Sequence, residues 1–262
     1  MTFAIVLIGW IFSLCLHEFS HALVAYFGGD TTVKDKGYLT FNPLKYTHPL
    51  YSIVLPLVFL LMGGIGLPGG AVYIETWRLK NRTWQSLVSL AGPTANLIML
   101  IILGIVLQFA PLETSDKNSI WPGLAFLALL QASALVLNLI PLPPFDGYGI
   151  LEPFLNPDLR DRINSMRTWI MLLVFLALWN IPAVNNMFWT QVYLVSSRLG
   201  VPWDLAWSGF DRFGSGCCKQ AITRFLDPQG GFAGNLVFYF VDISRYKNHC
   251  PLRSSTFFMA RS

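Results

Sequence analysis

The chain has 262 residues, of which 54% are hydrophobic, 15% are aromatic and only 12% are charged. An ordinary soluble domain carries roughly 25% charged residues, so this composition argues against a soluble enzyme and indicates an integral membrane protein. The net charge of +4 comes from Lys and Arg spread over connecting segments. Because no basic block could follow a phosphate backbone, we expect no nucleic-acid partner.

The first predicted membrane span covers residues 2–27, where the N-terminal half carries no charge and the length suffices to cross a bilayer. A cleaved signal peptide is the alternative interpretation. However, no Lys or Arg precedes the apolar run, and no small-residue cleavage site follows it. The sequence Gly28-Gly29-Asp30 predicts where this helix stops.

The connection that follows has a mixed composition. Short segments at 38–41 and 71–74 have strand-like composition. Between them, residues 50–66 are apolar but form a short stretch. Two interpretations stay open for this stretch, a short span and a re-entrant or interfacial hairpin. The residues that interrupt it are Pro56, Gly63, Gly64 and Gly66.

Two clearer spans follow at 84–109 and 121–140, each opened by a Trp at a plausible headgroup level. A further apolar stretch, 168–199, is interrupted at Asn180-Ile181-Pro182 and either crosses with a kink or turns back. Residues 201–262 form a tail for which no periodicity can be sustained. We therefore expect an all-α polytopic membrane domain over 1–200. It would have a three-helix catalytic core, the re-entrant hairpin and one or two C-terminal membrane segments.

The distribution of Lys and Arg bears on the orientation of the chain. If 50–66 is re-entrant, the connections 28–83 and 141–167 share one side and carry nine basic residues, against one in 110–120. Positively charged connections favour the cytoplasmic side. If 50–66 instead spans the membrane, the Lys and Arg residues divide six against four between the two sides, and this count does not indicate an orientation. The re-entrant interpretation places the cytoplasmic face at the C-terminal end of the first span.

The motif with catalytic chemistry is His17-Glu18-Phe19-Ser20-His21, an HExxH sequence within the first span. Histidines four residues apart lie on one helical face, so both imidazoles can reach one Zn²⁺, and Glu18 is placed to accept a proton. Burying a charge in lipid costs roughly 2–3 kcal/mol even on a lenient scale, so such groups are functional by default. The alternative is an interfacial cluster that simply ends the helix.

A catalytic zinc needs a third protein ligand and an open fourth position. Asp146 follows the span 121–140 on a proline-rich stretch, and Gly147 permits a tight turn there. Spacing alone favours a ligand and a solvated turn residue equally. Topology favours the ligand, because the spans 2–27 and 121–140 run parallel if 84–109 crosses between them. Other His and Glu residues lie outside the apolar spans, namely His48, His249, Glu75, Glu113 and Glu152.

The span 84–109 contains Gly92-Pro93-Thr94-Ala95-Asn96, whose small residues permit close helix approach. Two roles for Asn96 stay open, a contact to substrate and an interhelical hydrogen bond.

Three motifs, HEFSH, AGPTAN and NLIPLPPFDG, stand in the order typical of the site-2 protease family of intramembrane zinc metalloproteases, which this chain resembles over residues 2–200. The resemblance implies His17, His21 and Asp146 as zinc ligands and Glu18 as catalytic base. It also implies that Asn96 and Asn138 line or support the substrate site. The segments 41–45 and 64–70 resemble the family's membrane re-entrant β-hairpin, with Gly64 and Gly66 near substrate. No PDZ or CBS regulatory domain is recognisable.

The function implied is zinc-dependent hydrolysis of a peptide bond in or near the transmembrane segment of a single-pass substrate, as in regulated intramembrane proteolysis. The alternatives are a membrane metal transporter and a catalytically silent, substrate-binding pseudoprotease. The expected location is a bacterial cytoplasmic membrane, or an organelle membrane derived from one, with the active site toward the cytoplasmic side. The sequence predicts no oligomeric state.

Overall fold

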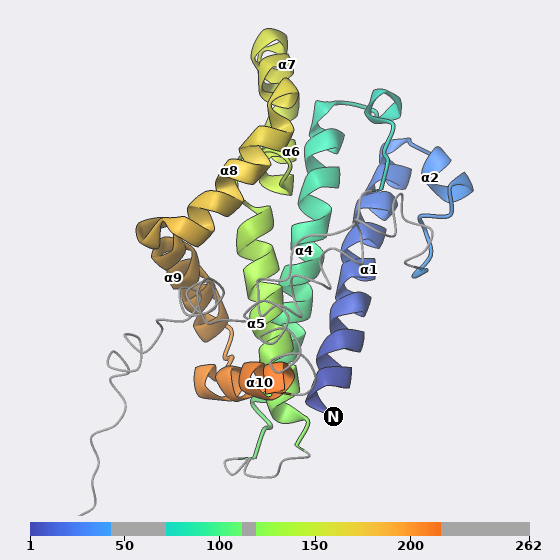
Figure 1. The fold of residues 1–262 in the computed structure, drawn as a ribbon. Helices are drawn as coiled ribbons and strands as arrows, with labels where there is room; N and C mark the ends of the chain where they lie inside the picture. The colour runs from blue at the N-terminus through green and yellow to red at the C-terminus, as the bar shows by residue number, and fades with distance from the viewer. Residues whose placement is uncertain (43–71, 112–118, 216–262) are drawn as a thin grey trace, which may run out of the picture.

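A computed structural model of the protein describes residues 1–42, 72–111 and 119–215. Three long helices lie side by side: α1 (Thr2–Gly28), α4 (Arg82–Leu107) and α5 (Trp121–Asn138) (Figure 1). Within the described residues, these three are the single helices long and apolar enough to cross a membrane. Their ends lie within two residues of the predicted spans, because the length of each apolar run determines where a helix can remain in lipid.

Helix α5 is the central helix of the bundle. Within its most apolar 18-residue window 78% of the residues are buried, against 44% for α1 and for α4. Its small and apolar side chains pack against Val6 and Trp10 of α1 and against Leu100 and Leu103 of α4. Outward-facing apolar residues of α4 and α8 are instead exposed, as expected where lipid is the solvent; they are Ile98, Ile102, Ile105, Trp169, Leu173 and Leu176.

Short elements gather at the end of the bundle where α1 ends and α4 begins (Figure 1). Helix α1 stops at the predicted place. There Gly29 takes a φ of 120°, which disfavours a side chain, and Asp30 N donates to the carbonyl of Ala25. The short elements are α2 (Thr32–Asp35), η3 (Thr76–Arg78), α6 (Asp146–Leu151), η4 (Glu152–Phe154) and α7 (Pro157–Ser165).

The apolar stretch 168–199 is divided into two helices, α8 (Arg167–Asn180) and α9 (Pro182–Arg198). The break falls at Ile181, because Pro182 has no N–H to continue the helix and restricts the residue before it. Helices α7 and α8 are bent by 63° relative to each other, the geometry of a broken span or a re-entrant pair. Helix α9 follows α8 toward the lower end of the bundle and packs against α5 (Figure 1).

Helix α10 (Trp203–Ser215) crosses the opposite end of the bundle and packs against α5 (Figure 1). Sequence periodicity did not predict a helix there, although aromatic residues of α10 form a packed cluster with Phe126 of α5 and Phe3 of α1. Residues 216–262 of the expected tail lie outside the described residues, and the proposed division at residue 200 stays a prediction.

The prediction of strands at 38–41 and 71–74 is wrong for the described part of these segments, where residues 38–41 and 72–74 form turns or irregular chain. The physical reason is that strand-like composition records how well side chains fit a paired, half-buried surface, and no paired neighbour is present among the described residues. The stretch 50–66, with Gly64 and Gly66, lies outside the described residues. The re-entrant hairpin therefore stays a prediction.

Candidate metal centre

Helix α1 carries the HExxH residues toward the interior of the bundle. His17, Glu18 and His21 are all buried, with 4–7% of each residue exposed. The two imidazole rings face α4 rather than lipid, since a Cβ built on Gly92 of α4 would lie within 2.5 Å of both. The helical spacing that the sequence indicated therefore places both histidines on one inward face.

Asp146 is the first residue of α6, which turns back beside the C-terminal end of α5. This turn requires Gly147, because a Cβ there would clash with the carbonyl oxygen of Leu139 and would lie 2.6 Å from that of Ile140. The turn carries the Asp146 carboxylate to the two histidines, as the topology predicted.

The three side chains converge on one point. His17 Nε2 lies 3.1 Å from His21 Nε2 and 3.2 Å from Asp146 Oδ2, and His21 Nε2 lies 3.5 Å from Asp146 Oδ1. Ligand atoms of a tetrahedral zinc, each about 2.0–2.1 Å from the metal, lie roughly 3.3 Å from one another. The two imidazole nitrogens lie close to that separation, and one ligand atom from each of the three residues can be chosen so that all three lie within 4.8 Å of one another.

The hydrogen bonds around the three side chains also fit a metal. Asp146 Oδ2 is buried and accepts no hydrogen bond from any described residue, although an imidazole nitrogen is only 3.2 Å away. A buried carboxylate oxygen without a donor is costly unless a cation satisfies it. The oxygen and the nitrogen are therefore placed to share a cation. Among the described residues this is the only group of three or more metal-ligating side chains that gather in this way.

The backbone of α4 orients His21. Its Nδ1 lies 2.6 Å from the carbonyl oxygen of Val88, and a carbonyl can only accept, so Nδ1 carries the hydrogen. The lone pair of Nε2 then faces the metal position, which is the usual arrangement for a ligating histidine. Gly92, one turn further along α4, provides the space in which both imidazoles fit.

Glu18 has a main-chain partner from a distant part of the sequence. The N–H of Val72 donates to Glu18 Oε2 over 3.2 Å, and Val72 lies in the irregular segment that leads to η3. A base held by a third group is the usual arrangement in hydrolytic sites. Sequence reasoning missed the contacts of Val88 and Val72, because they are made by backbone atoms and carry no side-chain signature. The small residues of the AGPTAN motif were the one available indication that α4 approaches its neighbours closely.

The two predicted asparagines are both buried inside the helix bundle. Asn96 lies one helical turn beyond Gly92 on α4 and is 4% exposed, and Asn138 is the last residue of α5 and is 3% exposed. Residues four apart share a helical face, so Asn96 lies on the face of α4 that Gly92 presents to the histidines. Their contact to substrate stays a prediction, and Gly64 and Gly66 lie outside the described residues.

Membrane-length helices that enclose two histidines and a carboxylate define a class of membrane metalloproteins, and relatives narrow that class. The chain is 47% identical over 200 residues to Rip2 of Mycolicibacterium smegmatis, covering 76% of this chain and 75% of that protein. It is 44% identical over 212 residues to Rip2 of Mycobacterium tuberculosis H37Rv, covering 79% and 78%. It is 32% identical over 187 residues to YwhC of Bacillus subtilis, covering 70% and 83%.

The names of all three relatives assign them as zinc metalloproteases. No protein-family model and no solved structure matches the chain. With identities of this size over roughly three quarters of its length, the chain belongs to the site-2 protease family of metalloproteases. The resemblance stated from the three motifs is confirmed.

Proposed function

We propose that this protein is an intramembrane zinc metalloendopeptidase that cleaves a membrane-anchored protein in or near its transmembrane segment. The observation that carries the proposal is the convergence of His17, His21 and Asp146 beside Glu18, inside helices that are long and apolar enough to cross a membrane. Its expected setting is regulated intramembrane proteolysis, with a single-pass protein as substrate. The relatives are named as zinc metalloproteases, so the metal proposed for this site is Zn²⁺.

The residues present divide the chemistry between them. His17 and His21 through Nε2 and Asp146 through its carboxylate would hold the ion, with the fourth position open. When bound, zinc polarises a carbonyl and brings the pKa of water down to about 7. Glu18 takes the proton of the attacking water and passes it to the leaving amine nitrogen. A helical substrate must unwind locally, because its carbonyls are otherwise occupied by intrahelical hydrogen bonds.

The orientation proposed is with the metal centre toward the cytoplasm, in a bacterial cytoplasmic membrane. Most described basic residues belong to elements at the end of the bundle where α1 stops, whereas Arg198 and Arg212 belong to α9 and α10 toward the other end (Figure 1). A surplus of Lys and Arg favours the cytoplasmic side. The residues at the first end are Lys34, Lys36, Arg78, Lys80, Arg82, Arg160, Arg162 and Arg167.

The test is cleavage of single-pass reporter proteins by the purified full-length chain in detergent, with zinc content measured on the same samples. Glu18→Gln should keep its zinc and lose about 100-fold or more in kcat, since it removes the general base. Glu152→Gln, the same exchange on η4 away from the centre, should behave as wild type. Zinc binding without cleavage of any reporter would favour a pseudoprotease or a transporter, and cleavage by zinc-loaded Glu18→Gln would remove Glu18 as the base.

A further inference from the structure

The segment Val72–Glu75 is hydrogen-bonded at both of its ends to the chain around α1. At its first residue, Val72 N donates to Glu18 Oε2 over 3.2 Å, and at its last residue, Glu75 N donates to Asp30 Oδ2 over 2.8 Å. Three peptide units reach at most about 10–11 Å, so the chain between these two bonds is short. A displacement of Glu75 must therefore also displace Val72.

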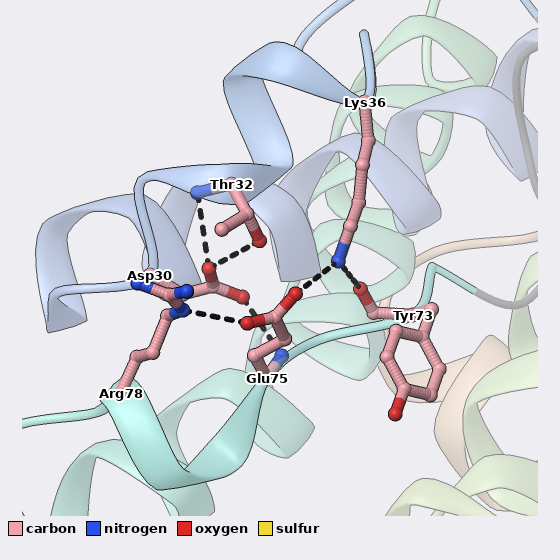
Figure 2. Close-up of polar contacts among 6 residues, drawn as sticks. All are labelled: Asp30, Thr32, Lys36, Tyr73, Glu75 and Arg78. Atoms are coloured by element: carbon pink, nitrogen blue, oxygen red, sulfur yellow. Dashed lines mark hydrogen bonds and ion pairs between the residues drawn. The ribbon is translucent and has the colours of Figure 1, made fainter.

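Asp30 is the fixed point of this arrangement. It is completely buried, and its Oδ1 accepts from the backbone N–H of Thr32 over 3.1 Å and from the Thr32 hydroxyl over 2.6 Å (Figure 2). Its other oxygen accepts from Glu75 N. Hydrogen bonds to an ionised carboxylate are stronger than neutral ones, and a buried carboxylate with three donors has little freedom to move.

The Glu75 side chain attaches the same segment to α2 and η3. Lys36 Nζ lies 3.0 Å from Glu75 Oε1 and donates to the carbonyl oxygen of Tyr73 over 3.3 Å, while Arg78 Nε lies 2.5 Å from Glu75 Oε2 (Figure 2). A single ion pair at a surface contributes little, but these contacts share one carboxylate and act on one short segment. We call Asp30, Lys36, Glu75 and Arg78 the anchor.

The anchor acts on the base through the Val72 N–H. A carboxylate has two oxygens, and the Val72 N–H engages Oε2 of Glu18. No hydrogen bond from the described residues engages Oε1, which leaves that oxygen to take a proton. General-base catalysis depends on this geometry first, because the accepting oxygen must lie within hydrogen-bond reach of the proton that it removes.

We infer that Asp30 and Glu75 are positioning residues that hold the Val72 N–H against Glu18 Oε2 and thereby aim the other carboxylate oxygen, Oε1, of the base. The inference rests on the proposed function of Glu18 and deepens it. The anchor touches neither His17, His21 nor Asp146, so its loss should change the rate of the chemical step and leave the metal in place. A merely structural anchor would leave that rate unchanged in the folded protein.

The experiment compares Asp30→Asn, Glu75→Gln and the control Asp35→Asn, each as purified full-length protein. Asp35 is an exposed carboxylate on α2, next to Lys36 in the sequence but outside the anchor. Four quantities are measured: zinc content, hydrogen–deuterium exchange of a peptide covering 72–78, and kcat and KM for a single-pass reporter. Glu75→Gln is included because Asp30→Asn, at a buried position, could fail to fold.

Both anchor variants should keep their zinc and exchange faster over 72–78, with unchanged exchange in α1 and α4. Their kcat should fall by about tenfold to a hundredfold at a nearly unchanged KM, the range expected for a misplaced catalytic group. Asp35→Asn should match wild type.

Faster exchange with an unchanged kcat, or a lower kcat accompanied by zinc loss, would overturn the inference. A wild-type protein that cleaves no reporter would instead overturn the proposed function, while zinc content and exchange would still report whether the anchor holds the segment.

Discussion

The metal centre and the anchor hold the residues around Glu18 in contrasting ways. The metal centre consists of three side chains on α1 and α6, packed against the backbone of α4. The anchor consists of charged side chains at the edge of the bundle, which act through a backbone N–H. If Glu18 is the base, as proposed, the contrast predicts that binding a metal and aiming the base can be separated in this fold. Changes at the first region should remove zinc, whereas changes at the second should slow a zinc-loaded protein.

The largest effect is expected for Gly92→Ala at the metal centre. A Cβ at this position would clash with His21 Nε2 and lie 2.5 Å from His17 Nε2, so both imidazoles would have to leave the positions from which they face the metal. Overpacking of this kind typically costs about 1–3 kcal/mol, here at the position the metal needs. The variant should lose most of its zinc and its cleavage activity. Zinc content by elemental analysis checks this.

Gly123→Ala on α5 is the matched control, because its Cβ would meet only ordinary contacts at 3.4–3.5 Å from Ile5 and Thr2. It should keep full zinc. A Gly92→Ala protein that also keeps full zinc would contradict the packing described for the centre.

A moderate effect is expected for a polar contact that belongs to neither region. Ser13 donates to Gln131 Oε1 over 2.5 Å between α1 and α5, and both residues are buried. Hydrogen bonds between membrane helices contribute on average about 0.6 kcal/mol and at most about 1.7. Gln131→Ala should lower the free energy of unfolding, measured by thermal denaturation in detergent, by an amount in this range. Part of the loss is due to packing, and the zinc content should stay unchanged.

Ser133→Ala is the control for that change, since the Ser133 hydroxyl donates to the carbonyl of Leu129 in its own helix. It should cost less stability than Gln131→Ala. Loss of zinc in Gln131→Ala would show that the centre depends on helix packing more widely than the separation of the two regions allows.

The smallest effect concerns the pH dependence of the anchor. Hydrogen bonds from Arg78 and Lys36 hold the pKa of Glu75 below its usual range, and Asp30 is the other carboxylate of the anchor. A lowered folded-state pKa gives stability that is present above the pKa of the unfolded chain and is lost as pH falls through the folded-state value. Wild type should therefore melt above Glu75→Gln at pH 7, and this difference should shrink below about pH 4. A difference that grows on acidification would contradict the ion pairs.

Much of the fold could be predicted because lipid imposes simple requirements on a sequence. The lengths of the apolar runs predicted α1, α4 and α5 to within two residues, and the glycines after Phe27 predicted the end of α1. The break at Ile181 was visible in the sequence, but the neighbours against which the two resulting helices pack were not. Helix α10 was missed because its apolar residues recur at helical spacing over only the first part of the predicted tail; they are Trp203, Ala206, Trp207, Phe210 and Phe213.

The candidate site could be predicted only as far as its side chains. The spacing of His17 and His21 on a helix, together with the order of the spans, sufficed to bring Asp146 to them. The carbonyl of Val88 and the N–H of Val72 could not be predicted, since nearly every residue has these groups and only tertiary packing selects which ones reach the site. Asp30 was interpreted as part of a helix stop, because its partner Glu75 lies more than forty residues later in the chain.

A single zinc held jointly by His17, His21 and Asp146 underlies every step proposed above, and the zinc stoichiometry of Asp146→Ala is the decisive measurement. The protein is purified with limiting zinc beside wild type, Glu18→Gln and Asp158→Ala, which removes an exposed carboxylate on α7. Those three proteins should carry close to one zinc per chain, while Asp146→Ala should carry far less. Full zinc occupancy in Asp146→Ala would contradict the three-ligand centre.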